Sequence, residues 1–542
     1  MPSVKAVMKQ RCIIIPAIKK NAVIPDQLVK KLAGVTLIER AIHTARAVAR
    51  GADVLVVTDS QEIALICERN GVCAHYNKEL HFSSLDIVAE LRSVLTRTAR
   101  EYEYVVVYRA SCPLVTWVDM EDAYRRFTAS GADCLITVKS VRQRVWQGQE
   151  EGIDSLLGDE DDGALVESKA LVMLRSEALI AGRITHTVPY FLNDRAIEIN
   201  SYQDWWICEK LLARRKLLFV VAGYPAIGMG HVYRALMLAH EIADHSIQFL
   251  CTGESELAVR SIAERDYKTL TQRGALADDV LALQPDLVIN DILDTDAAYI
   301  RRLKEAGIRV ANFEDEGSGA VEADLIINAL YSERSRDARF LYGPRYFCLR
   351  DEFASGCRNV FRPQARTVLI SFGGTDHSDF TRKTLDVVEP VCRERGMDIR
   401  VVAGPGYAHR EALERYLATL ANPRLTFTHA TNVMSRMMEG ADLAICSAGR
   451  TVYELAHMRV PAIVMAHHER ELSHRFAQAA NGFSWMGLMQ PDFHRDKLRR
   501  AFLRMLGTTV RKKLFERQNR FQFAKNKSHV VQRILSLFGS EG

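Results

Sequence analysis

Short apolar runs and amphipathic helical stretches take turns along nearly the whole chain. The first apolar runs are CIIIPA at 12–17, DVLVVTD at 53–59, YVVVYRA at 104–110 and ADCLITVKS at 132–140. Runs this short and this rich in Val and Ile are typical of buried strands, and the longer stretches between them have the period of helices. Strands that alternate with helices predict an α/β fold with a parallel sheet covered by helices.

The length of the chain indicates how many such sheets to expect. The chain has 542 residues, of which 48% are hydrophobic, so at roughly 100 to 200 residues per domain we expect about three domains. The helix-like segment DWWICEKLLARRK at 204–216 closes the first unit, and LLFVVAG at 217–223 opens the next. We therefore place the domains at 1–216, 217–360 and 361–542, the last with a helical tail.

From residue 217 the strand pattern repeats in two halves. The first half contains LVIND at 287–291 and RVANFED at 309–315; the second contains TVLISFGG at 367–374, IRVVAG at 399–404, ADLAICSAG at 441–449 and PAIVMA at 461–466. Two halves of this kind predict two facing doubly wound lobes.

Composition excludes several other classes of protein. The 72 Lys and Arg residues against 67 Asp and Glu give a net charge of +5 without a basic block, so we predict neither nucleic-acid binding nor a polybasic membrane anchor. The 11 cysteines form no CxxC pair, which predicts a reducing cytoplasm rather than a disulfide framework or a zinc site. No apolar stretch reaches the ~20 residues of a membrane span, and the start lacks the apolar core of a signal peptide.

Glycine-rich loops follow three of the strands predicted after residue 216. They contain Gly228, Gly230 and His231; Gly373, Gly374 and Thr375; and Ser447, Gly449, Arg450 and Thr451. Backbone N–H groups at such junctions hold anions, and doubly wound folds bind ligands at the ends of their strands. The loops therefore predict a diphosphate site, with tight-turn geometry as the alternative for any single loop.

Two side chains near these loops have candidate roles. His231 stands at a helix start, where a neutral imidazole can accept a proton from a nucleotide-linked substrate; the alternative is a packed or capping histidine. Glu454 lies one turn into a helix, where it can accept hydrogen bonds from two ribose hydroxyls. His467, His468 and His474 lack metal-site spacing and are read as ordinary loop and helix residues. The acidic run at 159–162 is read as a solvated loop, with a metal cluster as the alternative.

Six ordered motifs between residues 217 and 525 resemble one known family. They are IGMGHVYRALMLA at 227–239, PDLVIND at 285–291, ADLIINALY at 323–331, YGPRYFCLRDEF at 342–353, LISFGGTDHSDFTRKTL at 369–385 and SAGRTVYELAHMRVPAIV at 447–464. Together they resemble the UDP-2,4-diacetamido-2,4,6-trideoxy-β-L-altropyranose hydrolases of pseudaminic acid biosynthesis. That family shares a two-lobed fold, called GT-B, with the glycosyltransferases that make lipid II.

The resemblance implies that water attacks the anomeric carbon of a UDP-sugar and releases UDP with inversion, without a cofactor. The water-activating histidine of the family's GxGH motif maps to His231. The implied UDP-sugar contacts are Gly228, Gly230, Arg234, Gly373, Gly374, Thr375, Ser447, Gly449, Arg450, Thr451 and Glu454. Arg450 stands where the family has a second glycine, and ERELSHR at 469–475 replaces an Asn-Gln pair. Arg450 can contact a phosphate or a substrate carboxylate, or form a surface salt bridge.

The first strand is followed by Lys19 and Lys20, and basic residues in such a loop can neutralise a triphosphate or belong to a solvated turn. The segments at 13–41, 56–72, 111–123 and 197–205 resemble the cytidylyltransferases that activate sialic and related nonulosonic acids. This resemblance covers about residues 10–215 and implies a nucleotidyltransferase-like Rossmann domain. It implies CTP contacts at Ala17, Lys19, Lys20 and Asn21, and its magnesium-binding carboxylates fall at Glu198 and Asn200. Because magnesium prefers hard oxygen ligands, Glu198 with Asp204 is the pair predicted to hold Mg²⁺. The family's charged residues are absent at Ile18, Gln27 and Asn200, so a remodelled or inactive binding domain is the alternative.

The chain is therefore predicted to be a bifunctional enzyme of nonulosonic acid biosynthesis, of the pseudaminic or sialic type. One part hydrolyses a UDP-linked deoxyamino sugar, and the other transfers CMP from CTP to a nonulosonic acid. The alternatives are a GT-B glycosyltransferase with an inactive first domain and a nucleotide-sugar-binding scaffold. The expected partners are nucleotide-sugars and sugar acids; the sequence leaves the oligomeric state open, a homo-oligomer included.

Overall fold

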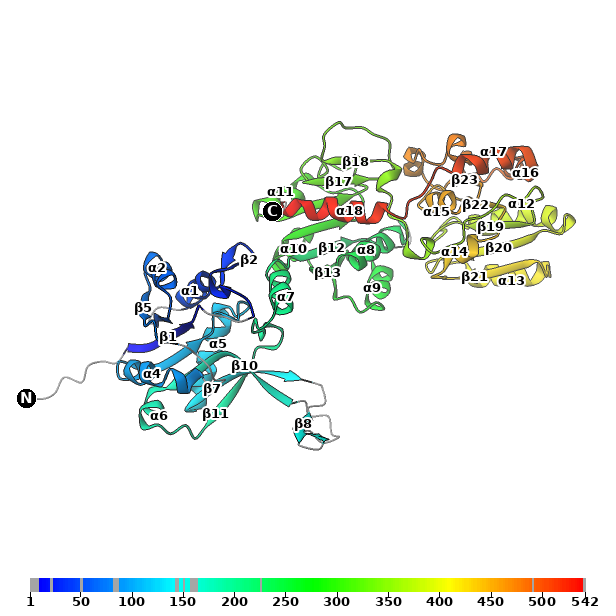
Figure 1. Cartoon of the computed structure of the whole chain (residues 1–542). Helices are drawn as coiled ribbons and strands as arrows, with labels where there is room; N and C mark the ends of the chain where they lie inside the picture. Colours follow the sequence, from blue (N-terminus) through cyan, green and yellow to red (C-terminus); the bar gives the residue numbers. More distant parts are fainter. Residues whose placement is uncertain are drawn as a thin grey trace, which may run out of the picture. The chain divides into compact units, whose positions relative to one another are not determined.

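The computed structural model describes residues 9–19, 23–48, 52–80, 87–141, 146–149, 152–155, 164–224, 227–489 and 492–539. The chain divides into two compact units, Met1–Arg214 and Arg215–Gly542 (Figure 1). Sheets of mainly parallel strands with helices between them form both units, so the predicted α/β fold class is confirmed. The acidic run at 159–162 and two predicted CTP residues, Lys20 and Asn21, lie outside the described residues.

The first unit is built on a seven-stranded sheet with the order β11-β7-β10-β6-β1-β4-β5. Strand β10 runs antiparallel to both of its neighbours, whereas the other strands are parallel to one another. The described residues between β7 and β10 form a hairpin and no helix. Antiparallel neighbours need no crossover helix, so the alternation of strands and helices in the sequence did not predict β10. The strands are β1 (Lys9–Ala17), β4 (Ala52–Thr58), β5 (Cys73–Tyr76), β6 (Tyr102–Tyr108), β7 (Cys134–Val141), β10 (Ala164–Arg175) and β11 (Thr187–Phe191), with hairpins β2 (Lys31–Leu32) and β3 (Val35–Thr36), and β8 (Trp146–Gln149) and β9 (Gly152–Ser155).

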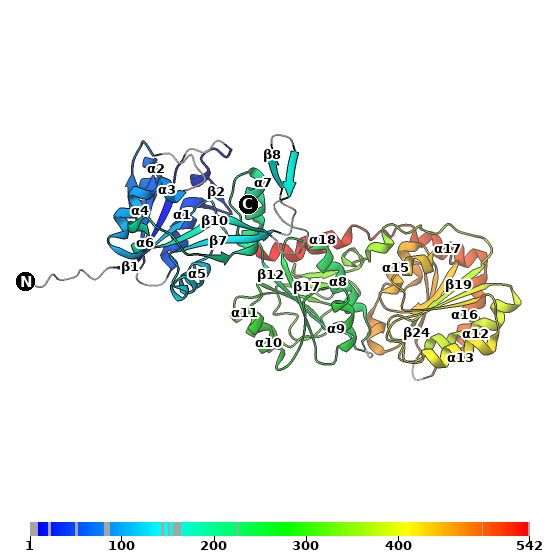
Figure 2. The same cartoon turned by 90° about the horizontal axis from the view of Figure 1, so that it is seen from below.

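Helices cover both faces of this sheet (Figure 2). In β1 the side chains alternate: Ile13 and Ile15 pack into one hydrophobic cluster, and Cys12 and Ile14 pack into another. The α-helices are α1 (Leu37–Ala47), α2 (Gln61–Arg69), α3 (Ile87–Glu90), α4 (Arg92–Ala99), α5 (Trp117–Ser130), α6 (Ser176–Ala181) and α7 (Tyr202–Leu212), and the short 3-10 helices, labelled η, are η1 (Gln27–Val29) and η2 (Asn193–Arg195).

The second unit begins with a parallel seven-stranded sheet in the order β14-β13-β12-β15-β16-β17-β18. Its strands are β12 (Lys216–Val221), β13 (Ser246–Cys251), β14 (Thr269–Thr271), β15 (Leu287–Asp291), β16 (Arg309–Phe313), β17 (Leu325–Asn328) and β18 (Phe340–Tyr342). The helices of this first lobe are α8 (Gly230–Glu241), α9 (Glu256–Ala263), α10 (Leu276–Leu283) and α11 (Ala297–Glu305); η3 (Pro344–Tyr346) and η4 (Asp351–Phe353) follow.

The second lobe holds a parallel six-stranded sheet in the order β21-β20-β19-β22-β23-β24. Its strands are β19 (Thr367–Ser371), β20 (Asp398–Ala403), β21 (Leu425–His429), β22 (Leu443–Ser447), β23 (Ala462–Ala466) and β24 (Phe483–Leu488). The helices are α12 (Phe380–Glu394), α13 (Arg410–Leu420), α14 (Met434–Met438), α15 (Thr451–Met458), α16 (Arg495–Leu506) and α17 (Thr508–Gln518), with η5 (Glu469–Ser473) and η6 (Ala479–Asn481). In both lobes the strand order reverses beside the first strand, which is the doubly wound arrangement predicted from the sequence.

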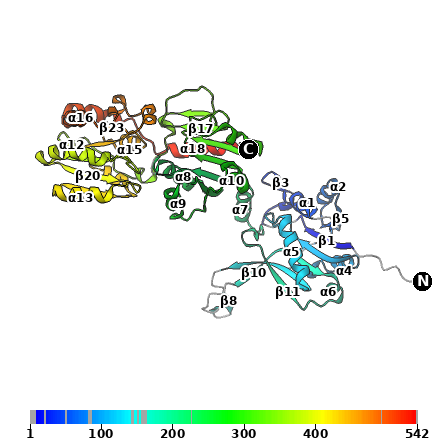
Figure 3. The ribbon, with the colours of Figure 1, turned by 180° about the vertical axis from the view of Figure 1, so that it is seen from behind.

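One hydrophobic cluster contains buried residues of both lobes. Phe347, between the lobes, stacks on Tyr453 of α15 with ring centres 4.2 Å apart. After α17 the chain returns to the first lobe, where α18 (Asn526–Leu535) lies along α8 (Figure 3). There Lys527 Nζ lies 2.9 Å from the carboxylate of Glu241. In the part of the chain that the structure describes, no helix has the length and apolar character that crossing a membrane requires.

Candidate functional site

The glycine-rich loops predicted to hold a nucleotide meet where the two lobes touch. A Cβ atom on Gly374 would lie 3.1 Å from the backbone nitrogen of Met229, and one on Gly230 would lie 3.1 Å from Cδ of Arg450. Larger side chains at these two positions would therefore push neighbouring atoms away. The absence of side chains lets loops from different lobes approach closely.

The predicted UDP-sugar residues belong to these loops and to the helices that begin at them. Gly228 and Gly373 have φ values of +78° and +82°, which glycine adopts without strain. The remaining residues are Gly230, His231 and Arg234 in α8; Gly374 and Thr375 after β19; Ser447 at the end of β22; Gly449 and Arg450 before α15; and Thr451 and Glu454 in α15. The structure thus gathers the predicted residues around one junction, and their contacts with a nucleotide stay predictions.

His231 is the second residue of α8, and its imidazole contacts a carboxylate of the sheet. Nδ1 lies 2.5 Å from Oδ1 of Asp291, the last residue of β15. Only 9% of the His231 side chain and 1% of the Asp291 side chain are exposed. Because an ionised carboxylate only accepts hydrogen bonds, a neutral imidazole in this contact has its proton on Nδ1 and its lone pair on Nε2. Nε2 is therefore the ring atom that can take a proton from a reacting group.

Arg234 lies one turn further along α8 and also contacts the carboxylate of Asp291. Its Nε donates to Oδ2 at 2.7 Å and its Nη2 donates to Oδ1 at 2.6 Å. Its Nη1 lies 2.5 Å from Oε1 of Glu314, the residue that follows β16. The Arg234 side chain is 2% exposed, so one buried guanidinium serves two buried carboxylates in a two-pronged arrangement that lysine could not reproduce.

The charges in this cluster depend on one another. Burial by itself would raise the pKa of Asp291, but the charge of Arg234 and the contact with His231 hold that pKa below its usual value. Burial likewise opposes ionisation of Glu314, yet Arg234 and Arg450 keep its pKa low. Both carboxyls are therefore ionised at neutral pH, and Asp291 acts as an acceptor toward His231.

Arg450 comes from the second lobe and packs over the residue before His231. Its Nη2 donates to the carbonyl oxygen of Cys348 at 2.7 Å, and its guanidinium carbon lies 4.6 Å from the ring centre of Phe347. Nη1 is buried, and no described residue accepts a hydrogen bond from it. Burial, together with nearby Arg234, lowers the pKa of Arg450. Arg450 thus places an inward-facing positive charge beside the glycine-rich loops.

Glu454, the predicted ribose ligand, is buried and already paired. Arg350 Nε donates to its Oε1 at 2.9 Å, and Arg350 Nη1 also lies 3.1 Å from Glu352. A ribose at Glu454 would therefore share the carboxylate with Arg350, and the predicted role stays a prediction.

A buried carboxyl lies behind the turn at 447–449. Glu471 Oε2 accepts a hydrogen bond from the backbone nitrogen of His467 at 2.7 Å, and Oε1 is 4.0 Å from where a Cβ of Gly449 would be. Burial raises the pKa of Glu471 to about 7. This carboxyl therefore changes its protonation near neutral pH, next to a loop predicted to hold phosphates.

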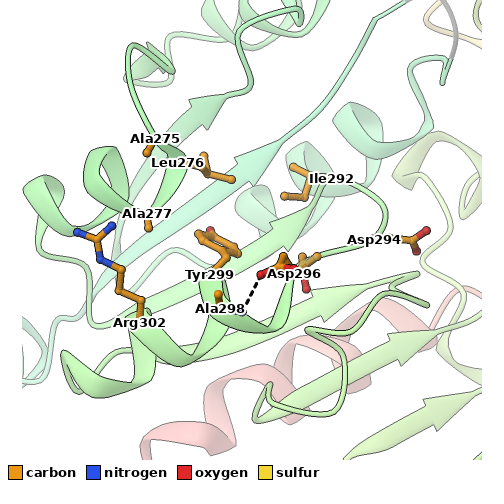
Figure 4. Close-up of a pocket in the computed structure, with 10 residues that line it drawn as sticks. Ala275, Leu276, Ala277, Ile292, Asp294, Asp296, Ala298, Tyr299 and Arg302 are labelled. Carbon is orange, nitrogen blue, oxygen red and sulfur yellow. Dashed lines mark hydrogen bonds between the residues drawn. The ribbon is translucent and has the colours of Figure 1, made fainter.

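A pocket of about 410 Å³ opens in the first lobe, near α10 and α11 (Figure 4). Its lining residues are Ala275, Leu276, Ala277, Ile292, Asp294, Thr295, Asp296, Ala298, Tyr299 and Arg302. Asp294 at one end of the pocket also binds Arg470 of the second lobe, so the pocket adjoins a contact between the lobes.

In the first unit, the predicted CTP residues Ala17 and Lys19 lie at the end of β1. The backbone nitrogen of Lys19 donates to Oδ1 of Asp59 at 2.8 Å. Its ammonium group lies 2.5 Å from Glu62 and 3.6 Å from Asp26, and the hydrogen bond that it donates to Glu62 is the main cause that raises the pKa of Lys19. The Lys19 ammonium, which was predicted to neutralise a triphosphate, is thus paired with the carboxylates of Glu62 and Asp26.

The predicted magnesium ligands, Glu198 and Asp204, accept hydrogen bonds from neighbouring residues. Arg109 Nη1 donates to Glu198 Oε1 at 2.8 Å, and Asn200 Nδ2 lies 3.3 Å from Oε2. Asp204 Oδ2 accepts from Ser201 Oγ at 2.8 Å and from the Asn200 nitrogen at 3.0 Å. Magnesium requires free oxygen lone pairs in a near-octahedral arrangement, and here an arginine already neutralises Glu198. As arranged, the two residues do not fit the ion, and across the described ranges no group of three or more His, Cys, Asp and Glu side chains could hold a metal.

Sequence reasoning missed three residues of the cluster near His231. Asp291 ends the run LVIND and Glu314 follows the run RVANF, so each carboxylate comes at the end of a buried parallel strand. That position was the available signal, since ligands bind at this edge of doubly wound sheets. Arg470 does not end a predicted strand, because it lies in the short 3-10 helix η5 between β23 and β24; its segment stood out only as a departure from the family's Asn-Gln pair.

The second lobe matches a family model, the glycosyltransferase family 28 C-terminal domain, over residues 367–532. Among curated proteins, the chain is 26% identical to an uncharacterised protein of Methanocaldococcus jannaschii over 273 residues, 47% of this chain and 56% of that protein. It is 26% identical over 268 residues to the spore coat polysaccharide biosynthesis protein SpsG of Bacillus subtilis, 47% of this chain and 78% of that protein. The chain thus spans just over half the length of the first of these relatives.

A third curated relative is of another kind. The chain is 35% identical to the 3-deoxy-manno-octulosonate cytidylyltransferase of Koribacter versatilis over 78 residues, 14% of this chain and 30% of that protein. Among solved structures, MurG of Acinetobacter baumannii has a TM-score of 0.43 at 16% identity, with 60% of this chain and 99% of that chain covered. One part of the chain is thus similar to a glycosyltransferase family and to a polysaccharide biosynthesis protein, and another part is similar to a cytidylyltransferase.

Proposed function

We propose that the second unit hydrolyses a UDP-linked deoxyamino sugar to the free sugar and UDP. The observation that carries this proposal is the contact between His231 and Asp291 beside the glycine-rich loops. Nε2 of His231 takes a proton from water while the water oxygen attacks the anomeric carbon from the face opposite the phosphate. The bond from that carbon to the β-phosphate oxygen breaks, UDP leaves, and the configuration inverts. Backbone N–H groups around Gly374 and Gly449 hold the departing diphosphate.

The proposal is tested by UDP release from candidate UDP-sugars without an acceptor. A base of this kind contributes about 10² to 10⁴ in rate, so His231→Ala should abolish measurable release while UDP affinity, measured by calorimetry, changes little. His240→Ala is the matched control, because His240 is an exposed residue of the same helix. Undiminished release from His231→Ala would remove His231 from the mechanism.

A glycosyltransferase is the second candidate, favoured by the family match over residues 367–532. In that reaction an acceptor hydroxyl replaces water at the anomeric carbon. UDP release that depends on an added acceptor supports the transferase, and release in buffer alone supports the hydrolase.

For the first unit we propose transfer of CMP from CTP to a nonulosonic acid, with release of pyrophosphate. The similarity to a cytidylyltransferase supports it. The pairing of Arg109 with Glu198 favours a second candidate, a nucleotide-binding scaffold without transfer activity. Incubation with CTP, Mg²⁺ and several nonulosonic acids distinguishes the two: pyrophosphate supports transfer, whereas cytidine nucleotide binding without pyrophosphate supports the scaffold. If both proposals are correct, the chain is a bifunctional enzyme in the biosynthesis of a nonulosonic acid of the pseudaminic or sialic type.

A further inference from the structure

A charged side chain of the second lobe reaches the residues that surround His231. Arg470 lies in η5, and its Nη1 and Nη2 donate to the two carboxylate oxygens of Asp294 at 2.7 and 2.9 Å. Its Nε donates to the hydroxyl of Tyr331 at 2.7 Å, and Nη2 also donates to the backbone carbonyl of Glu314 at 2.9 Å. All these acceptors belong to the first lobe, so Arg470 is a contact between the lobes.

Glu314 is held at both its backbone and its carboxylate. Its φ of +53° lies in the left-handed region, where a residue other than glycine stays only if its neighbours hold it. Its N–H donates to the carbonyl of Ile327 at 3.1 Å, its own carbonyl accepts from Arg470, and its carboxylate pairs with Arg234 at 2.5 Å. Of these three neighbours, Arg470 is the one that comes from the second lobe.

The contacts make one continuous chain from the second lobe to the imidazole. Arg470 binds Glu314, Glu314 binds Arg234, Arg234 binds Asp291, and Asp291 binds His231, each over 2.5 to 2.9 Å. The other four members of this chain of contacts, Glu314, Arg234, Asp291 and His231, are each at most 7% exposed. Solvent therefore offers these groups few other partners, and a change at one link disturbs the next.

We infer that Arg470 and Glu314 are positioning residues for His231, and this inference rests on the proposed hydrolysis of a UDP-sugar. While the lobes are in contact, Arg470 holds Glu314 and Glu314 holds Arg234. Arg234 then keeps Asp291 against Nδ1 of His231, so Nε2 stays open to water. The second lobe carries two of the three glycine-rich loops. The contact between the lobes therefore couples nucleotide binding at those loops to the orientation of the His231 imidazole.

The tautomer of His231 tests this inference in the full-length protein. Imidazole ¹⁵N and ¹³C chemical shifts report it, and the signal is assigned by its loss in His231→Gln. We expect the Nδ1–H form in the wild type and a mixture of both neutral tautomers in Arg470→Ala and in Glu314→Gln. Arg424→Ala, which removes a surface ion pair with Asp398 in the same lobe, should leave the signal unchanged.

An unchanged His231 signal in both Arg470→Ala and Glu314→Gln would overturn the inference. Should Arg470→Ala fail to fold, Arg470→Lys replaces it: lysine keeps the charge but loses the two-pronged contact, so we expect a smaller shift in the same direction. No shift in that variant would count against the inference equally.

Kinetics supply a second readout. In Arg470→Ala we expect the kcat for UDP release to fall about tenfold with KM changed less than about twofold, because a misplaced base affects the chemical step rather than binding. A raised KM with normal kcat would contradict the inference. A wild type that releases no UDP would overturn the proposed hydrolysis, whereas the tautomer measurement would still decide whether Arg470 and Glu314 position His231.

Discussion

Nδ1 of His231 and Oδ1 of Asp291 lie 2.5 Å apart, although 60 residues separate them in the sequence. The histidine is the second residue of the helix that follows the first strand of the lobe, and the aspartate ends the fourth strand, which pairs directly with the first. The pairing of β12 with β15 thus brings together an imidazole and a carboxylate that fixes its tautomer. Four consequences of the charged clusters can be measured.

Replacement of Asp291 by Asn should lower the kcat for UDP release by about 10² or more, which is the lower end of what a general base contributes. An amide can donate to Nδ1 and so stabilise the tautomer whose proton blocks Nε2. UDP affinity should change little. Full activity of Asp291→Asn would show that the carboxylate does not govern the histidine.

Removal of Arg234 should destabilise the second unit strongly. Arg234→Met leaves Asp291 and Glu314 buried without the guanidinium that pairs with both of them, a change that typically costs about 3 to 5 kcal/mol. Arg260→Met is the matched control, because Arg260 is 65% exposed and pairs with an exposed glutamate, so its effect should stay within about 0.5 kcal/mol. Thermal melting compares them, and equal melting temperatures would contradict the prediction.

Glu471 should make stability fall as pH rises. Its folded pKa of about 7 exceeds the ordinary value of 4.5, so the folded state binds more protons in this range. The contribution of Glu471 to stability is therefore fully present below pH 4.5 and decreases as the pH rises through about 7. In Glu471→Gln this loss should disappear, which melting temperatures measured across that range would show. Glu411→Gln, an exposed change in α13, should follow the wild type.

Divalent cation binding tests the arrangement around Glu198. With Arg109 in contact with this carboxylate, we expect weak Mn²⁺ binding to the nucleotide-free protein, measured by electron paramagnetic resonance. Arg109→Met removes the competing charge and should tighten binding about tenfold, the effect of one charge a few ångströms away in a partly screened site. Arg125→Met, at an exposed arginine paired with Asp122, should have no effect. Tight binding to the wild type that disappears in Glu198→Gln would contradict the prediction.

Much of the fold could be predicted because strand and helix periodicity are local. The runs at 12–17, 287–291 and 441–449 correspond to strands β1, β15 and β22. Strand β10 escaped prediction because the alternation of strands and helices indicates parallel pairs, whereas the return from β7 needs no helix.

The amino-acid sequence by itself determined the local elements of this protein: the alternation of strands and helices, the glycine-rich strand ends, and a histidine at a helix start. Tertiary structure alone decided which charges meet there. Asp291, Glu314 and Arg470 lie 60 to 239 positions beyond His231 along the chain, and only the strand order and the contact between the lobes bring them within reach. Electrostatic pairing depends on distance in space, and periodicity along a chain carries no information about that distance.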